Sequence, residues 1–135
     1  MKNIGLIGCG NIAETYFRAQ EYFNNINFVA CADINLDAAK KTAAQYNIIP
    51  LSVDEILNDK NVDIILNLTI PQAHYEISKR ALEANKHVYC EKPMSVKFDE
   101  AKELLNLAKK NSLYIGNAPD TCLLYTSPSP RDCDR

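Results

Sequence analysis

Several features are missing from this 135-residue sequence, and each absence narrows its function. No apolar run approaches the length needed to span a bilayer. The net charge is only −2, so there is no excess of positive charge to bind nucleic acid or an anionic membrane surface. The N-terminus enters a strand pattern at once, without a signal peptide, and the five cysteines show no metal-type clustering. We therefore expect a cytoplasmic protein with reduced cysteines and no metal, nucleic-acid or membrane partner.

The composition is that of an ordinary globular domain, with 47% hydrophobic and 24% charged residues over a length sufficient to bury a core. Strand-length apolar runs alternate with patterns of helical period, which predicts an α/β fold with a doubly wound parallel sheet of the Rossmann type. The expected strands are 2–7, 27–32, 48–49, 62–69, 87–90 and 113–116, and the expected helices are 11–23, 36–46, 52–58, 71–85 and 98–110.

Local signals sharpen these boundaries. Pro50 is expected to stop the third strand, because proline has no N–H to donate. Ser52 is followed three residues later by Glu55, which has the form of a capping box at the start of a short helix. Ile12 and Leu105 are expected on the buried sides of the first and last long helices, from their spacing to other apolar residues.

The first strand leads into a glycine-rich turn, in which Gly8, Gly10 and Ala13 occupy the small positions of a G-x-G-x-x-A dinucleotide pattern. Gly8 permits the tight turn, Gly10 lets the backbone approach a pyrophosphate, and Ala13 lets the helix lie close to its strand. The backbone N–H groups at the start of this helix, around Asn11 and Ile12, would face the phosphates. The turn therefore predicts nucleotide binding by residues 8–13.

A second signal is Asp33, which follows the second strand 23 residues beyond Gly10. A carboxylate at this distance is expected to meet the adenosine ribose hydroxyls of a dinucleotide. Ile34 follows it, with no adjacent arginine or lysine to receive a 2′-phosphate. We therefore expect NAD rather than NADP as the cofactor.

Two further segments leave neighbouring strands at the switch point of the predicted sheet, where ligands of open α/β sheets bind. Residues 69–74 contain Thr69, Pro71 and His74, and residues 91–93 are Glu91-Lys92-Pro93. A crevice lysine can polarise a substrate oxygen while hydride is transferred, although the same tripeptide is also compatible with a solvated turn. His74 is either a capping or core histidine, or a residue near the nicotinamide ribose or substrate.

Together these motifs resemble the cofactor domain of the Gfo/Idh/MocA oxidoreductases, a family that includes glucose-fructose oxidoreductase and inositol 2-dehydrogenase. The resemblance runs from residue 1 to about residue 121, and Glu91-Lys92-Pro93 is its most specific element. It implies that Lys92 is the substrate-facing catalytic lysine, assisted by His74, and that Glu91, Thr69 and Pro71 line the nicotinamide. It also implies a second domain that supplies sugar or polyol contacts and a homo-oligomer interface.

The Phe-Leu-Gly that the resemblance predicts after Thr121 is absent. Residues 122–132 read CLLYTSPSPRD, which resembles the translation of a transposase sequencing adapter. We therefore interpret residues 1–121 as the dinucleotide-binding domain and residues 122–135 as a non-native, disordered tail, to be left out of fold reasoning. On this interpretation the substrate domain is missing, and the chain should bind cofactor with little or no turnover.

The sequence thus indicates the nucleotide-binding domain of an NAD-dependent oxidoreductase that acts on a sugar-type or polyol-type carbinol or carbonyl. Two alternatives remain open. A non-catalytic dinucleotide-binding sensor would leave Lys92 without a role, and a Rossmann-like methyltransferase that binds S-adenosylmethionine would leave both Lys92 and residues 69–74 unexplained.

Overall fold

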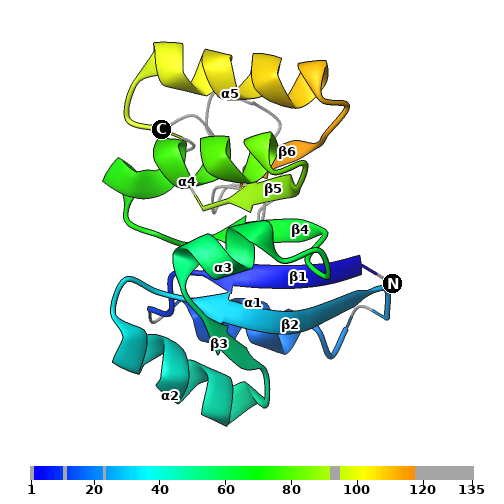
Figure 1. The fold of residues 1–135 in the computed structure, drawn as a ribbon, viewed down its shortest axis with the longest axis vertical. Helices are drawn as coiled ribbons and strands as arrows, with labels where there is room; N and C mark the ends of the chain where they lie inside the picture. Colours follow the sequence, from blue (N-terminus) through cyan, green and yellow to red (C-terminus); the bar gives the residue numbers. More distant parts are fainter. Residues whose placement is uncertain (1, 11, 23, 92–94, 118–135) are drawn as a thin grey trace, which may run out of the picture.

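The computed structural model describes residues 2–10, 12–22, 24–91 and 95–117. Asn11, Lys92 and the tail at 122–135 lie outside the described residues, so their predicted roles stay predictions. Strands and helices alternate along the described chain (Figure 1). The elements are β1 (Lys2–Ile7), α1 (Ala13–Ala19), β2 (Ile26–Ala32), α2 (Leu36–Tyr46), β3 (Ile49–Leu51), α3 (Val53–Asn58), β4 (Ile64–Asn67), α4 (Pro71–Glu83), β5 (His87–Cys90), α5 (Phe98–Lys110) and β6 (Ile115–Asn117).

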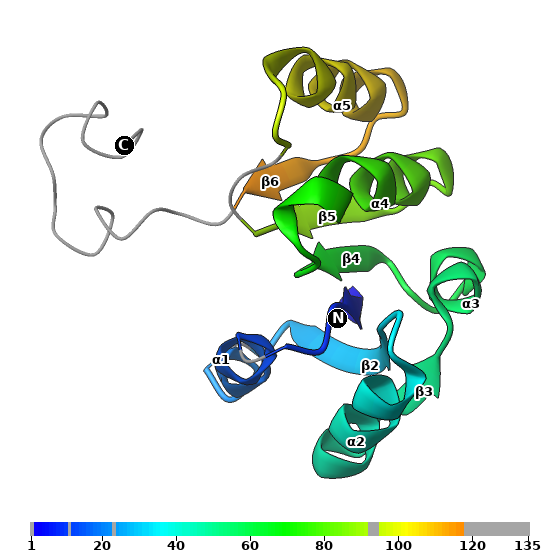
Figure 2. The same cartoon turned by 90° about the vertical axis from the view of Figure 1, so that its left-hand side faces the viewer.

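The strands form one sheet in the order β3-β2-β1-β4-β5-β6, and every neighbouring pair is parallel. This arrangement confirms the predicted doubly wound sheet. After β3 the chain crosses back over the sheet to place β4 beside β1, which makes the carboxyl ends of β1 and β4 the switch point. Helix α1 lies on the opposite side of the sheet from α3 and α4 (Figure 2).

Two hydrophobic clusters fill the two faces of the sheet. The α1 and α2 face is closed by aromatic contacts, in which Phe17 stacks on Tyr46 with ring centroids 4.0 Å apart and also packs against Phe28. The α3, α4 and α5 face holds Ile56, Leu82 and Leu104, all fully buried. Since both faces of the sheet bury apolar side chains, the strands read as apolar runs rather than as alternating patterns.

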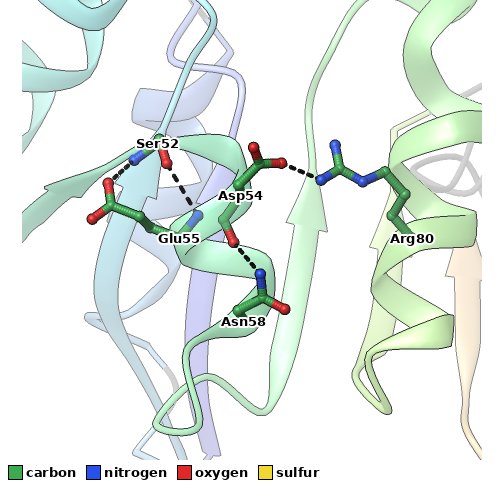
Figure 3. A network of polar contacts seen from close by, with 5 residues as sticks. All are labelled: Ser52, Asp54, Glu55, Asn58 and Arg80. Carbon is green, nitrogen blue, oxygen red and sulfur yellow. Dashed lines mark hydrogen bonds and ion pairs between the residues drawn. The ribbon is translucent and has the colours of Figure 1, made fainter.

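The capping box at α3 forms as predicted (Figure 3). The Ser52 hydroxyl accepts a hydrogen bond from the Glu55 N–H at 3.1 Å, and the Glu55 carboxylate accepts one from the Ser52 N–H at 2.9 Å. One turn later, the Asn58 side chain donates to the Asp54 carbonyl at 2.9 Å. The Asp54 carboxylate pairs with the Arg80 guanidinium of α4, so the cap of α3 is linked to the neighbouring helix.

The first helix is shorter than predicted. Residues 20–22 form turns closed by bonds between residues three apart, such as Gln20 N–H to the Phe17 carbonyl at 3.2 Å, instead of continuing the α-helix. The Gln20 side chain meanwhile accepts the Phe28 N–H at 2.9 Å. The prediction that Ile12 is buried was wrong: it precedes the helix and is 42% exposed, while Ala13 and Phe17 form the buried stripe.

Pro50 does not stop the third strand, because β3 runs through it as Ile49–Leu51. This strand lies at the edge of the sheet, where a residue without an N–H is tolerated on the outer side. The prediction that Leu105 is buried was also wrong: it is 50% exposed on α5, whereas Leu104 and Ala108 are the buried residues of this helix. Of the helices that the structure describes, none is long and apolar enough to cross a membrane.

Candidate functional site

The glycine turn joins β1 to α1 at the switch point, and its small residues differ in what they do. Gly8 has a φ of +105°, and a Cβ at this position would lie 2.5 Å from the Leu68 carbonyl oxygen. A Cβ on Gly10 would meet no atom within 4 Å, so the outer side of the turn is open. Ala13 is 3% exposed and packs in the core. The structure therefore has the tight turn predicted at Gly8 and the close packing predicted at Ala13. At Gly10 the turn leaves room for another molecule to approach the backbone.

Asp33 follows β2 and holds the glycine turn directly. One oxygen of its carboxylate, Oδ2, accepts the Cys9 N–H at 2.7 Å, and the other, Oδ1, accepts the Asn35 N–H at 2.8 Å. The side chain remains partly exposed. Because each carboxylate oxygen can accept two hydrogen bonds, both retain a lone pair for ribose hydroxyls. Asp33 thus links the turn after β1 to the loop after β2.

A mostly apolar cleft of about 190 Å³ opens between the glycine turn and the start of α4. Among the described residues that line it, Asp33 is the only charged one; they are Ile7, Gly8, Asp33, Ile34, Val53, Thr69, Ile70, Ala73 and Ile77. Ile34 and Ile70 are 96% and 64% exposed at its rim. Apolar side chains around a single carboxylate are a lining suited to a flat ring system that carries hydrogen-bond donors at one end.

Two larger hollows also open on the surface of the domain. One, of about 430 Å³, is at the amino ends of β1 and β5 around Lys2 and Lys86. The other, of about 490 Å³, is between α1 and α2 and reaches Cys9 and Gly10 of the glycine turn. Ligands of open α/β sheets bind beyond the carboxyl ends of the strands. This rule excludes the hollow around Lys2 and Lys86. The hollow between α1 and α2 adjoins the glycine turn from the helix side, and the smaller apolar cleft, which includes Asp33, is the candidate site for the adenosine.

A buried polar network fixes the loop after β4. The Asn67 side chain is fully buried, donates to the His74 carbonyl at 3.0 Å and to the Ser78 hydroxyl at 2.9 Å, and accepts from the Thr69 hydroxyl at 2.6 Å. His74 is 1% exposed, and its Nε2 lies 2.6 Å from the Thr69 carbonyl oxygen. Pro71, by contrast, is exposed in the first turn of α4. Of the three predicted residues in this loop, Thr69 lines the cleft and His74 lies beneath it.

One contact at the switch point was not predicted from the sequence. The Tyr16 hydroxyl of α1 donates to Oε2 of Glu91 at 2.5 Å, although the two residues are 75 positions apart. Burial, followed by the hydrogen bond to Glu91, raises the pKa of Tyr16 well above its ordinary value. The Tyr16 ring also packs edge-on against Tyr89, with centroids 6.3 Å apart. The only sequence signal was the position of each residue, in the first helix and just after β5.

The structure thus brings Gly8, Asp33 and Thr69 together around one cleft, and Glu91 to the same edge of the sheet. Gly10 lines the neighbouring hollow between α1 and α2 instead. Ile12 is partly exposed just before α1. Within the described ranges, no three side chains of histidine, cysteine, aspartate or glutamate are grouped closely enough to hold a metal ion.

Comparison with known proteins identifies relatives over most of the described chain. The profile of the Gfo/Idh/MocA family, described as "Oxidoreductase family, NAD-binding Rossmann fold", matches residues 2–118. Inositol 2-dehydrogenase of Salmonella typhimurium is 28% identical over 111 residues, which are 79% of this chain and 33% of that enzyme.

Two solved structures show the same fold with cofactors bound. The WlbA dehydrogenase of Chromobacterium violaceum, in complex with NADH and UDP-GlcNAcA, superposes with a TM-score of 0.82 at 26% identity, over 87% of this chain and 34% of its own. The biliverdin reductase of Synechocystis, in complex with biliverdin and NADP⁺, has a TM-score of 0.80 at 26% identity, over 85% of this chain and 37% of its own.

The chain spans between a fifth and a third of the length of the curated relatives that it matches. The family profile matches residues 2–118, which contain the glycine turn and the six-stranded sheet of this chain. This protein therefore belongs to the Gfo/Idh/MocA family of oxidoreductases, as a chain with their NAD-binding Rossmann fold.

Proposed function

We propose that this chain is the cofactor domain of an oxidoreductase that transfers hydride between a nicotinamide and a sugar-type or polyol-type carbinol or carbonyl. On this proposal residues 1–121 form the domain, and residues 122–135 do not belong to it. The observation that carries it is the position of Asp33, which borders the apolar cleft and binds the glycine turn at the same time. The relatives that act on inositol or bind UDP-GlcNAcA support the substrate class.

The residues around the cleft fit the successive parts of a dinucleotide. The adenine would lie between the side chains of Ile34 and Ile70, with its ribose hydroxyls donating to the free lone pairs of Asp33. The pyrophosphate would pass over Gly10, where the turn is open. The nicotinamide half then extends toward the carboxyl ends of β4 and β5, beside Thr69 and Glu91.

We further propose a preference for NAD(H) over NADP(H). A 2′-phosphate at the adenosine ribose would lie against the Asp33 carboxylate, and none of the described residues that line the cleft is a lysine or arginine that would offset the repulsion. The relatives differ on this point, since one structure contains NADH and another NADP⁺. The preference therefore rests on Asp33 and its neighbours in this chain.

Calorimetric titration with NADH, NADPH and S-adenosylmethionine tests these proposals. NADH should bind most tightly, and tighter binding of S-adenosylmethionine would replace the dehydrogenase proposal with a methyltransferase one. Asp33→Asn keeps an acceptor oxygen and removes the charge, so it should reduce the difference in binding affinity between NADH and NADPH. The control variant is Asp37→Asn, in the exposed first turn of α2. It also removes one negative charge, close to Asp33, and should leave the difference in affinity between NADH and NADPH unchanged. Equal NADH and NADPH affinity in the unmutated chain would refute the preference.

When bound, the nicotinamide supplies the hydride chemistry, and the protein contributes orientation and electrostatics. We propose that Lys92 hydrogen-bonds the reacting oxygen and stabilises its developing negative charge. The burial of His74 favours a role in which it positions Thr69 rather than touching the substrate. In a full-length protein with a substrate domain, Lys92→Met should lower kcat by about two to three orders of magnitude and change NADH affinity far less. A raised KM with near-normal kcat would make Lys92 a binding residue only.

A further inference from the structure

We propose that Tyr16 is a positioning residue for the nicotinamide half of the site, and that it acts by holding the Glu91 carboxylate at the carboxyl end of β5. The proposal rests on the proposed binding of a dinucleotide, and it assigns a role to a residue outside the glycine turn and the cleft. Glu91 would offer its second oxygen to a hydrogen-bond donor of the nicotinamide half, either the carboxamide NH₂ or a ribose hydroxyl.

The contact bridges the two halves of the sheet. Tyr16 belongs to α1, which follows the glycine turn, whereas Glu91 follows β5 in the second half. Their side chains meet at 2.5 Å, the distance of an O–H···O⁻ bond to a charged acceptor. Movement of the end of β5 relative to α1 would break this bond, so it fixes the distance between the pyrophosphate turn and the nicotinamide side of the crevice.

Glu91 is held by its backbone as well as by its side chain. Its N–H donates to the Asn67 carbonyl at 2.9 Å, which continues the pairing of β5 with β4 beyond Cys90. The Tyr16 bond occupies Oε2, and Oε1 has no hydrogen bond to another described residue. The side chain is only partly buried. A carboxylate anchored in this way presents one oxygen at a fixed place, which is what recognition of a single donor requires.

Tyrosine suits this role because it is held as a neutral donor. Its ring is half-buried against Tyr89, and the phenol is protonated at physiological pH because its ordinary pKa is about 10. Burial and the hydrogen bond to Glu91 raise that pKa further. Phenylalanine in its place would fill the same volume and leave Oε2 without its donor. The substitution Tyr16→Phe therefore isolates the hydrogen bond from the packing.

The position of the pair predicts which part of the ligand it affects. Asp33 follows β2, on one side of the turn, and Glu91 follows β5, on the other side, with β1 and β4 between them. A dinucleotide that places its adenosine at Asp33 extends its nicotinamide toward Glu91. ADP-ribose has the adenosine and pyrophosphate of NADH and lacks the nicotinamide, so the two ligands separate the two ends of the site.

The test is a calorimetric titration of the full chain with NADH and with ADP-ribose. Tyr16→Phe and Glu91→Ala should each weaken NADH binding by about tenfold, the scale of one hydrogen bond to a charged group, and ADP-ribose binding by less than about twofold. The double variant should lose no more than Glu91→Ala alone, because Tyr16 acts through Glu91. Tyr75→Phe is the matched control: its hydroxyl also donates to a glutamate, Glu103, at 2.5 Å, but between α4 and α5, and NADH affinity should not change.

Three results would overturn the proposal: equal losses for both ligands, additive losses in the double variant, or unchanged NADH affinity in Tyr16→Phe. Equal losses would mean that Tyr16 supports the glycine turn instead. Failure of the unmutated chain to bind either ligand would refute the proposed function itself, and the assignment of Tyr16 with it. Normal binding of both ligands by the unmutated chain and by Tyr16→Phe would refute the assignment of Tyr16 alone.

Discussion

The two glycines of the turn can be separated by one substitution each, Gly8→Ala and Gly10→Ala. At Gly8 the added methyl group would lie 2.5 Å from the Leu68 carbonyl oxygen and 2.6 Å from its carbon, both backbone atoms that cannot rotate away. The φ of +105° is in addition one that alanine rarely adopts. At Gly10 the methyl group would meet no protein atom within 4 Å, and its φ is outside the strained range.

The expected effects on stability therefore differ in size and sign. Backbone strain at Gly8 contributes about 1–3 kcal/mol and the steric overlap a further 1–3 kcal/mol, so Gly8→Ala should destabilise the fold by about 4 kcal/mol. At about 4 °C per kcal/mol, the midpoint of thermal unfolding should fall by about 15 °C. Gly10→Ala should leave the midpoint unchanged or raise it slightly, since alanine reduces the entropy of the unfolded chain by about 0.4–1 kcal/mol.

The effect on ligand binding should be the reverse. The methyl group of Gly10→Ala would occupy the open side of the turn over which the pyrophosphate is proposed to pass, and NADH affinity should fall by at least about tenfold. Thermal unfolding followed by circular dichroism, together with calorimetric titration, measures both quantities on the same variants. A stable Gly8→Ala protein would refute the close approach to Leu68. Unchanged NADH affinity in a folded Gly10→Ala protein would refute the path of the pyrophosphate.

Three further predictions concern stability. The pKa of Tyr16 is raised by burial and by Glu91, Tyr89 and Cys90, so the neutral phenol stabilises the folded state. This contribution to stability is complete below about pH 10, the ordinary tyrosine pKa, and is lost as the pH rises further. The stability difference between the unmutated chain and Tyr16→Phe should therefore shrink above pH 10 in urea titrations, and a difference that grows there would contradict the assigned cause. Ser52→Ala removes the acceptor for the Glu55 N–H and should cost about 1 kcal/mol in the same assay, whereas no change would mean that the cap contributes nothing. Deletion of residues 122–135 should shift the thermal midpoint by less than about 2 °C, because both hydrophobic clusters of the described residues lie between Ile4 and Ile115, and a large fall would make the tail part of the fold.

Much of this fold could be predicted because its signals are local. The spacing of Gly8, Gly10 and Ala13 after an apolar strand defines the first turn, and the Ser52 and Glu55 pair defines the start of α3. Two errors, at Ile12 and Leu105, concern which side of a helix is buried, because the apolar spacing did not fix the start or the buried face of the helix. The error at Pro50 depends on residues far away in the sequence. Pro50 is compatible with a strand only because β3 is at the sheet edge, and the strand order is a property of the whole topology.

The glycine turn and Asp33 could be predicted from the sequence. The hydrogen bonds that hold these residues in place could not. The Asp33 carboxylate was expected to face a ribose, but its bond to the Cys9 N–H joins two segments that no local pattern connects. The Tyr16 and Glu91 pair is similar, since the parallel sheet brings them together only once β4 and β5 have been placed beside β1. His74 could be read either as a core or as a ligand residue, and the structure shows it buried, with its Nε2 2.6 Å from the Thr69 carbonyl oxygen.

The position of Pro50 also bears on how the protein avoids aggregation. A parallel sheet has two edges, and an exposed edge strand can pair with a strand of another molecule. On the β3 edge, Ile49 is 61% exposed and would favour such pairing, but the neighbouring proline offers no N–H to an incoming strand. The strand is also only three residues long, as is β6 at the other edge. A residue that interrupts the regular hydrogen bonding of the sheet thereby disfavours pairing of the β3 edge with a strand of another molecule.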